Sequence, residues 1–110
     1  MAGKFELKKS PSGKFMFNLK AGNGQIILTS QMYATKASAA NGIESVRKNS
    51  QDDSRFDRKV AKNGEPFFSL TSSNGQNIGK SESYSSASAM ENGVASVKKN
   101  APDAPVADNT

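Results

Sequence analysis

Apolar and polar side chains alternate along the first ten residues of the chain. Phe5 and Leu7 are each followed by a charged residue, and a period of two is typical of a β-strand with one buried face. The same spacing recurs at Phe17 and Leu19, and a third apolar stretch contains Ile27. The pattern predicts three short strands.

Glycine-containing segments separate these three stretches. Residues 11–13 read Pro-Ser-Gly, and Asn23-Gly24 follows the second stretch. An Asn-Gly pair readily adopts the positive φ angles of a two-residue hairpin turn. The three strands are therefore predicted to form an antiparallel meander.

The apolar positions that follow have a helical period. Ala39, Ile43 and Val46 are spaced i, i+4 and i+7, which places them on one side of an α-helix. Thr35 is predicted to cap this helix, because its hydroxyl can accept a hydrogen bond from a free backbone amide. Gly42 lies inside the helix, where glycine costs about 1 kcal/mol relative to alanine. We therefore expect the backbone at Gly42 to approach the sheet or a tyrosine ring closely.

The whole pattern occurs twice. A shift of 51 positions aligns residues 5–50 with residues 56–101 without a gap, and about 17 aligned positions are identical. In the second copy Asn63-Gly64 stands at the first turn and Ser86 at the helix cap. The chain therefore consists of two tandem strand-strand-strand-helix repeats.

One repeat of about 45 residues is too small to bury a sufficient core alone. We therefore predict an α+β fold in which both repeats form one antiparallel sheet of about six strands, with both helices on one face and a pseudo-twofold axis between the copies. This single domain covers residues 1–101. Residues 102–110 lack periodicity and are predicted to be a disordered tail. The predicted core includes Phe17, Leu19, Phe68 and Leu70.

The combination of these motifs resembles a known family. Residues 17–19 read Phe-Asn-Leu, residues 30–33 read Ser-x-x-Tyr and residues 41–46 read Asn-Gly-Ile-x-Ser-Val, with a corresponding set in the second copy. This combination resembles the YegP-like family of uncharacterised bacterial proteins, and in particular its duplicated, tandem-repeat subfamily. The resemblance covers residues 3–101 and implies an α+β fold and a bacterial, cytoplasmic protein. It implies no activity, so no site residue is carried over from it.

The 110-residue chain contains neither cysteine nor histidine. This excludes disulfides, thiol nucleophiles and thiolate metal sites, together with the commonest general base and metal ligand. A lack of cysteine is typical of the reducing cytoplasm, where we expect the protein to be located. No apolar run approaches the roughly 18 residues that span a bilayer, and the N-terminus lacks a secretory-signal pattern. We expect no contact with a membrane.

The carboxylates and glycines do not form a recognisable catalytic pattern. Glu6 recurs as Asp57 and is interpreted as an outward-facing strand residue that pairs with a neighbouring lysine. Asp52-Asp53 lacks the spacing of a calcium loop, and Gly22-Asn23-Gly24 lacks the Lys-Ser/Thr of a phosphate-binding loop. We therefore predict that the protein is not an enzyme, with no catalytic or metal-binding residue and no cofactor.

Charge is distributed unevenly between the two repeats. Residues 1–50 carry eight Lys/Arg and two acidic residues, for a net charge of +6, whereas residues 51–110 carry seven and eight, for −1. If Phe17, Leu19 and Ile27 face the helices, the opposite face of the first repeat displays lysines around a small apolar centre. The candidate binding face consists of Lys4, Lys8, Lys14, Met16, Lys20, Ile26 and Leu28.

Two hypotheses for function follow from these patterns. In the first, the chain is a small non-catalytic binding or structural module whose open sheet face contacts a protein partner or a second copy of the chain. In the second, the basic first repeat binds nucleic acid weakly and without sequence preference, although Phe67 is the only aromatic residue expected on that face for base stacking. The chain is expected to be a monomer, because its second repeat fills the place of a partner. The sequence does not identify a ligand or a pathway.

Overall fold

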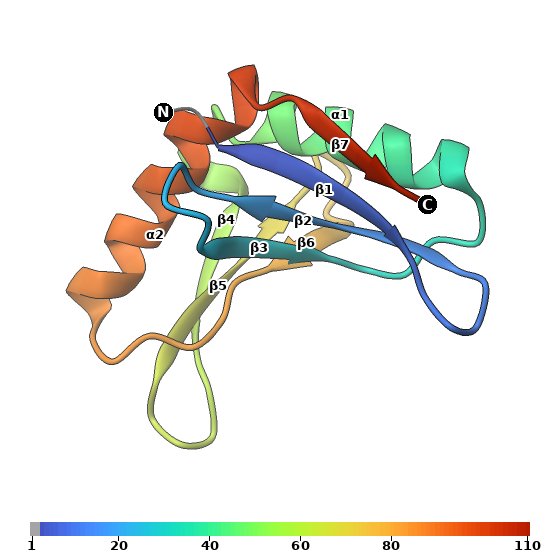
Figure 1. Cartoon of the computed structure of the whole chain (residues 1–110). Helices are drawn as coiled ribbons and strands as arrows, with labels where there is room; N and C mark the ends of the chain where they lie inside the picture. Colours follow the sequence, from blue (N-terminus) through green and yellow to red (C-terminus); the bar gives the residue numbers. More distant parts are fainter. Residues whose placement is uncertain (1–2) are drawn as a thin grey trace.

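The computed structural model describes residues 3–110, and both repeats have the predicted strand-strand-strand-helix order (Figure 1). In chain order the elements are β1 (Lys4–Lys9), β2 (Phe15–Lys20), β3 (Ile26–Ser30), α1 (Lys36–Asn49), a 3₁₀ turn (Asp53–Arg55), β4 (Phe56–Val60), β5 (Pro66–Thr71), β6 (Asn77–Lys80), α2 (Ala87–Asn100), a second 3₁₀ turn (Ala101–Asp103) and β7 (Val106–Asn109).

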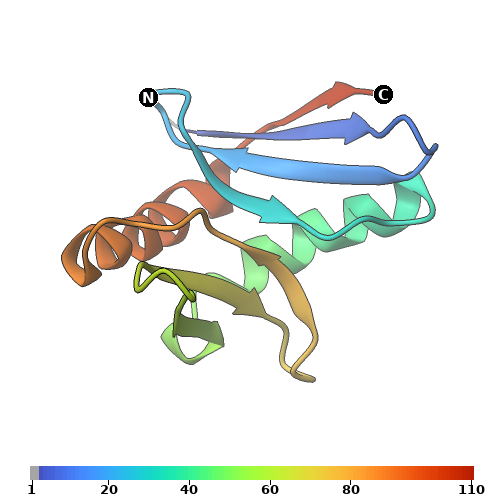
Figure 2. The same ribbon diagram turned by 90° about the horizontal axis from the view of Figure 1, so that it is seen from below.

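The strands of both repeats join into one sheet with the order β4-β5-β6-β3-β2-β1-β7. The repeats meet where β3 pairs antiparallel with β6, and there Thr29 lies opposite Lys80. These two residues hold equivalent positions under the 51-residue shift, so the pseudo-twofold axis passes through this pair. Figure 2 shows the strands of the first repeat with β7 as one group and those of the second repeat as another, twisted relative to each other. The α+β fold with one sheet and two helices is confirmed.

Four similar loops connect the strands within the repeats. In each loop a glycine has a φ angle of 84° or 85°, namely Gly13, Gly24, Gly64 and Gly75, and no other residue type has a positive φ among the residues that the structure describes. Each glycine amide donates to the carbonyl three residues earlier, as Gly24 does to Ala21 at 2.9 Å. The predicted two-residue turn is therefore wrong: Asn23 keeps a negative φ, and the glycine alone supplies the left-handed conformation of a longer loop.

Both helices begin as the sequence indicates. The side chain of Thr35 accepts a hydrogen bond from the Ser38 amide, and Ser86 accepts one from the Ala89 amide. Each helix packs its apolar side onto the central strand of its own repeat, where Phe17 and Phe68 are completely buried. Since these rings lie on the same face of the continuous sheet, both helices cover one face and leave the other open.

A β-bulge changes the face of the third strand in each repeat. Leu19 lies opposite Leu28, but the next residue, Lys20, lies opposite Ile26, so Ile27 is an extra residue on β3. A bulge of this kind turns two successive side chains toward the same side. Both Ile27 and Leu28 are consequently buried. The prediction that Leu28 lies on the open face is wrong, because strict alternation does not hold across the bulge.

The prediction of a disordered tail is also wrong. Val106–Asn109 forms β7, which pairs with β1 in parallel and makes the sheet mixed rather than wholly antiparallel. The backbone amide of Phe5 donates to the carbonyl of Pro105 at 2.8 Å, and the guanidinium of Arg47 donates to the carbonyl of Ala104 at 2.6 Å. The tail carries little apolar pattern because main-chain hydrogen bonds and polar anchors, rather than a hydrophobic stripe, hold it in place.

Candidate functional site

The predicted basic face exists on the side of the sheet away from the helices, with one exception. The register places Lys4 opposite Lys20 and Lys8 opposite Met16 on strands β1 and β2. Lys14 is exposed in the loop between these strands, and Ile26 lies opposite Lys20. Leu28 does not belong to this face, because it is fully buried on the helix side. The sheet therefore assembles the predicted lysines around Met16 and Ile26, without Leu28.

Glu6 lies in the middle of these lysines and neutralises part of their charge. Its carboxylate is 2.9 Å from Lys8 Nζ and 3.0 Å from Lys20 Nζ. These hydrogen bonds, first from Lys8 and then from Lys20, hold the pKa of the Glu6 carboxyl below its usual value. The predicted pairing of Glu6 with a neighbouring lysine is confirmed. Two lysines of the candidate face are thus already occupied by an acidic partner.

The second repeat contributes lysine to the same face, which the sequence reasoning missed. Lys80 lies opposite both Thr29 and Ser69, beside the pseudo-twofold axis. The bulge in this repeat pairs Gly79 with Leu70 on the helix side, so the next residue, Lys80, faces the open side. The open face is therefore more evenly basic across the two repeats than their net charges indicate.

A different pair of sites lies on the helix side, between the two repeats. Cleft A, of about 230 Å³, is formed by helix α1 of the first repeat and the β5–β6 hairpin of the second. Cleft B, of about 390 Å³, is formed by helix α2 of the second repeat and the β2–β3 hairpin of the first. The pseudo-twofold axis relates the two clefts, so each needs both repeats.

The same residue types line both clefts. Six positions at which the two repeats are identical contribute to each cleft, four from the helix side and two from the opposing hairpin. Cleft A contains Tyr33, Asn41, Gly42 and Ser45 with Gln76 and Ile78, and cleft B contains Tyr84, Asn92, Gly93 and Ser96 with Gln25 and Ile27. Among the described residues that line the clefts none is charged. About a third of the positions that are identical in the two repeats thus line the two clefts.

Packing explains some of these identities. The Tyr33 ring lies over Gly42 and stacks on Phe17 at a centroid distance of 6.2 Å, and Tyr84 repeats this arrangement on Gly93. The Ser45 hydroxyl accepts a hydrogen bond from Asn49 at 3.1 Å, and Ser96 accepts one from Asn100 at the same distance. The expectation that the helix glycine permits close approach of a tyrosine ring is confirmed.

Packing does not explain the four carboxamides. Asn41, Asn92, Gln25 and Gln76 are exposed, and within residues 3–110 their side chains form no hydrogen bond. Each of these amide groups therefore has two donors and an acceptor that are available to solvent or to a polar ligand. The signal was present in the sequence as repeated identities, but only the fold showed that residues of one helix and the other hairpin come together.

The tyrosine hydroxyls are neutral groups in this setting. Burial raises the pKa of Tyr33, and burial followed by the charge of Glu82 raises the pKa of Tyr84. Both phenols therefore stay protonated around neutral pH and can only donate or accept hydrogen bonds. At neutral pH the two tyrosines therefore present uncharged hydrogen-bonding groups at the clefts.

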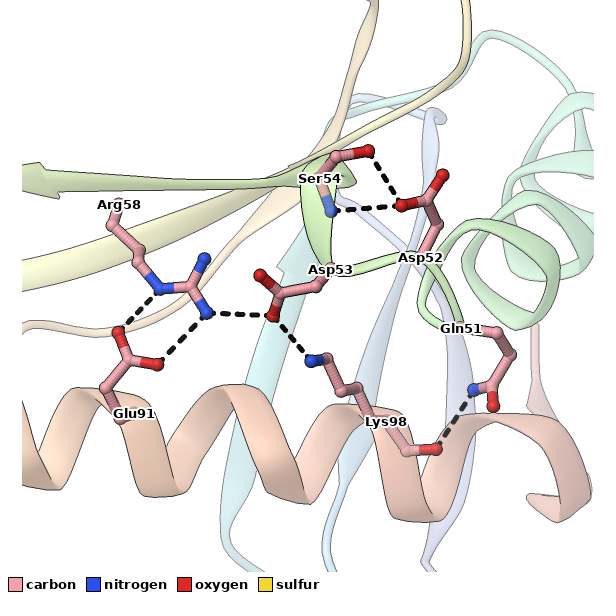
Figure 3. Close-up of polar contacts among 7 residues, drawn as sticks. All are labelled: Gln51, Asp52, Asp53, Ser54, Arg58, Glu91 and Lys98. Atoms are coloured by element: carbon pink, nitrogen blue, oxygen red, sulfur yellow. Dashed lines mark hydrogen bonds and ion pairs between the residues drawn. The ribbon is translucent and has the colours of Figure 1, made fainter.

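The linker between the repeats contains a charge network with a structural role (Figure 3). Asp53 accepts hydrogen bonds from Arg58 at 3.0 Å and from Lys98 at 2.5 Å, and Arg58 also bonds both carboxylate oxygens of Glu91. Hydrogen bonds from Lys98 and then Arg58 lower the pKa of Asp53. The network ties the linker and β4 to helix α2. Asp53 is already satisfied by two cations.

The structure was also searched for metal-binding groups and membrane-spanning helices within residues 3–110. No group of three His, Cys, Asp or Glu side chains that could hold a metal ion occurs in the described part of the chain. No helix within residues 3–110 is long and apolar enough to cross a membrane.

The repeat and its fold match a known family. The family model described as domain of unknown function DUF1508 matches residues 10–57 and again residues 61–108. The chain belongs to this family. The resemblance to YegP-like proteins is confirmed, since the chain is 51% identical to the UPF0339 protein YegP of Escherichia coli strain K12, with all of both chains covered.

Other members of the DUF1508 family share both sequence and fold. A UPF0339 protein of Bordetella pertussis is 57% identical over all of this chain and 98% of its own length. The solution structure of yegP from E. coli, described as a protein of unknown function, superposes with a TM-score of 0.95 at 51% identity, covering 100% of this chain and 95% of that chain. The solution structure of a UPF0339 protein from Shewanella oneidensis gives a TM-score of 0.93 at 48% identity, covering 98% and 92%.

The two DUF1508 matches divide the chain differently from the predicted repeats. Each match starts before the second strand of a repeat and ends in the strand after its helix, which is β4 in the first match and β7 in the second. The tail strand thus belongs to the family unit. In the sheet, β1 lies beside β2 in the first repeat, just as β4 lies beside β5 in the second. Strand β7 is added on the outer side of β1.

Proposed function

We propose that the protein is a non-catalytic binding module with two equivalent clefts, each of which binds a small, uncharged ligand rich in hydrogen-bonding groups. The observation that carries this proposal is the repetition of exposed, unpaired carboxamides. Asn41 and Gln76 line cleft A, and Asn92 and Gln25 line cleft B. Identical exposed residues without an intramolecular partner have no evident structural role, so recognition accounts for their presence in both repeats.

The chemistry of the clefts supports a neutral ligand. Their lining consists of carboxamides, hydroxyls and the nearly buried side chain of Ile27 or Ile78. A charged ligand would lose its hydration without gaining an opposite charge.

The lack of catalysis is part of the proposal. The chain contains no histidine or cysteine, and its cleft tyrosines hold their protons because burial raises their pKa. The lack of cysteine also supports the reducing cytoplasm as the place of action. Recognition by shape and neutral hydrogen bonds is the activity that these residues support.

An NMR screen of neutral sugars, polyols and capped dipeptides against the ¹⁵N-labelled full chain tests this proposal. A ligand should shift the side-chain amide signals of Asn41 and Gln76 together, and those of Asn92 and Gln25 together. Asn41→Leu should remove the first response and leave the second, with Asn92→Leu doing the reverse. Lys48→Ala, at an exposed position of α1 outside both clefts, is the matched control. A preference for charged compounds, or hits on the open face alone, would contradict the proposal.

The open sheet face is a second candidate site, for a protein partner. Lys4, Lys8, Lys20 and Lys80 share this face with the half-buried side chains of Met16 and its equivalent Phe67. Lysines around apolar side chains suit an acidic surface with apolar residues at its centre. Nucleic acid suits this face less well, because Glu6 pairs with two of the lysines and Phe67 alone offers an aromatic ring for stacking.

A further inference from the structure

Strands β1 and β4 are equivalent by sequence, but only β1 has a further strand paired to its outer side. In the strand order, β1 is followed by β7, whereas β4 ends the sheet and pairs only with β5 among the described strands. Strand β4 is the counterpart of β1, since Phe56 aligns with Phe5 under the 51-residue shift. The chain thus contains one repeat with an extra parallel strand on its outer edge and one repeat without it.

The contact between β1 and β7 shows how a repeat of this kind binds an extended segment. Phe5 lies opposite Val106, and the amide of Phe5 donates to the Pro105 carbonyl at 2.8 Å. In a parallel pair, alternate residues of a strand direct their amide and carbonyl toward the same neighbour. Phe5 and Leu7 therefore face β7 with their backbone groups.

The same groups are available on β4. By the alignment, Phe56, Arg58 and Val60 direct their backbone amides and carbonyls away from β5. The Phe56 amide already donates to the carbonyl of Asp53 within the 3₁₀ turn. The amides of Arg58 and Val60 remain as donors along the edge, and Val60 is 70% exposed.

The cation that helps to hold the extra strand is also present in both repeats. Arg47 lies over the Phe5 ring at 5.4 Å and donates to the Ala104 carbonyl of the incoming segment. Its equivalent Lys98 lies over the Phe56 ring at 5.6 Å. Lys98 uses one donor on Asp53, and an ammonium group has two more.

Charged residues on an edge strand usually prevent unspecific pairing. Here the charged side chains of β4 are held away from the edge. Arg58 is bonded to Glu91 and Asp53 on the helix side (Figure 3), and Lys59 is paired with Asp57 at 3.4 Å. The edge is therefore open for backbone pairing.

We propose that the outer edge of β4 binds an extended segment of a partner protein as an additional strand, parallel to β4, as β1 binds β7. The segment would place a branched apolar residue beside Phe56 and a small residue beside Asp57, as Val106 and Ala107 lie beside Phe5 and Glu6. Strand addition of this kind takes its affinity from main-chain hydrogen bonds and its selectivity from alternate side chains. This site is separate from the clefts and from the open face.

The acetylated peptide Ala-Pro-Val-Ala-Asp-Asn-Thr, with the sequence of residues 104–110, is the probe. Added at millimolar concentration to the ¹⁵N-labelled full chain, it should shift the amide signals of Arg58 and Val60 and slow their hydrogen exchange severalfold. The signals of Phe5 and Leu7 should not change, because their edge is occupied by β7.

Two controls make the result specific. The same peptide with an N-methyl group on its second alanine cannot donate to the Phe56 carbonyl and should give no response. Val60→Pro removes one edge donor at an exposed position, where proline is tolerated, and should also abolish binding. Unchanged signals at Arg58 and Val60, an equal response to the methylated peptide, or changes confined to Phe5 and Leu7 would each overturn the proposal. Self-association of the chain without peptide would also overturn it by identifying a second copy as the occupant.

Discussion

The hydroxyl of Tyr33 lies directly against the backbone of Gly42. A Cβ atom at position 42 would be 2.5 Å from this hydroxyl and 2.9 Å from Phe17 Cε2. The second repeat has the same relationship, since a Cβ at Gly93 would meet the Tyr84 hydroxyl and lie 2.7 Å from its Cζ. Each helix thus approaches its tyrosine at the one residue that has no side chain.

Gly42→Ala should therefore destabilise the protein, although helix propensity alone would stabilise it by about 1 kcal/mol. The tyrosine and phenylalanine rings would have to move, and overpacking of this kind typically costs about 1–3 kcal/mol. Urea unfolding of Gly42→Ala and Gly93→Ala measures the effect. Ala95→Gly, at an exposed position of α2, is the control that measures the effect of helix propensity alone on the free energy of unfolding. A larger free energy of unfolding for both glycine variants would refute the packing explanation.

Phe17→Ala and Phe68→Ala should each lower the free energy of unfolding by about 3–5 kcal/mol. Both rings are completely buried, and each packs edge-on against the phenylalanine of its neighbouring strand. Replacement of Lys8 or Lys20 by alanine should cost at most about 1 kcal/mol, because each leaves the Glu6 carboxylate paired with the other lysine. Denaturant titration compares the two groups, and equal losses would show that the sheet faces are assigned wrongly.

The attachment of β7 should weaken in acid. Hydrogen bonds from Lys36 and then from Thr110 lower the pKa of Asp108 from 3.8 to about 2, and the Lys36–Asp108 pair joins the tail strand to α1 at 2.5 Å. Because the folded-state pKa is the lower one, this stabilisation is complete above pH 3.8 and is lost as the pH falls toward 2. The protection of the Val106–Asn109 amides against hydrogen exchange, expressed relative to the intrinsic exchange rate at each pH, should fall more than that of β2 between about pH 5 and about pH 2. In Asp108→Asn this extra loss of protection should disappear; its persistence would assign it to another group.

Short DNA or RNA should find no specific site on the open face at physiological salt. Phosphate contacts release counterions, so binding through a few lysines is weak, on the order of 10⁻⁴–10⁻⁶ M, and falls steeply with salt. In an NMR titration at low salt, shifts should cluster near Lys4, Lys8, Lys14 and Lys20 and vanish as salt rises. Salt-resistant, submicromolar binding would instead support nucleic acid as the ligand. Glu6→Gln, which releases Lys8 and Lys20, should strengthen the low-salt response.

Local physical chemistry explains what the sequence by itself determined. Glycines allow the four loop conformations, hydroxyls cap both helices, and the period of two or 3.6 residues sets which face of each element is apolar. These effects act within a few residues, so Phe17, Leu19, Thr35 and Gly42 could be assigned roles without a structure. The 51-residue internal repeat in the sequence also showed that the chain has two units and led to the prediction of one shared sheet.

Only the tertiary structure decided the features that depend on residues distant in the chain. The bulge that buries Leu28 arises from pairing with β2, and β7 is held by backbone groups of Phe5 and the side chain of Arg47. The clefts require a helix from one repeat and a hairpin from the other, which brings Asn41 near Gln76. Such contacts leave no periodic pattern, because main-chain hydrogen bonds and pairings between remote segments are independent of the spacing of apolar residues along the chain.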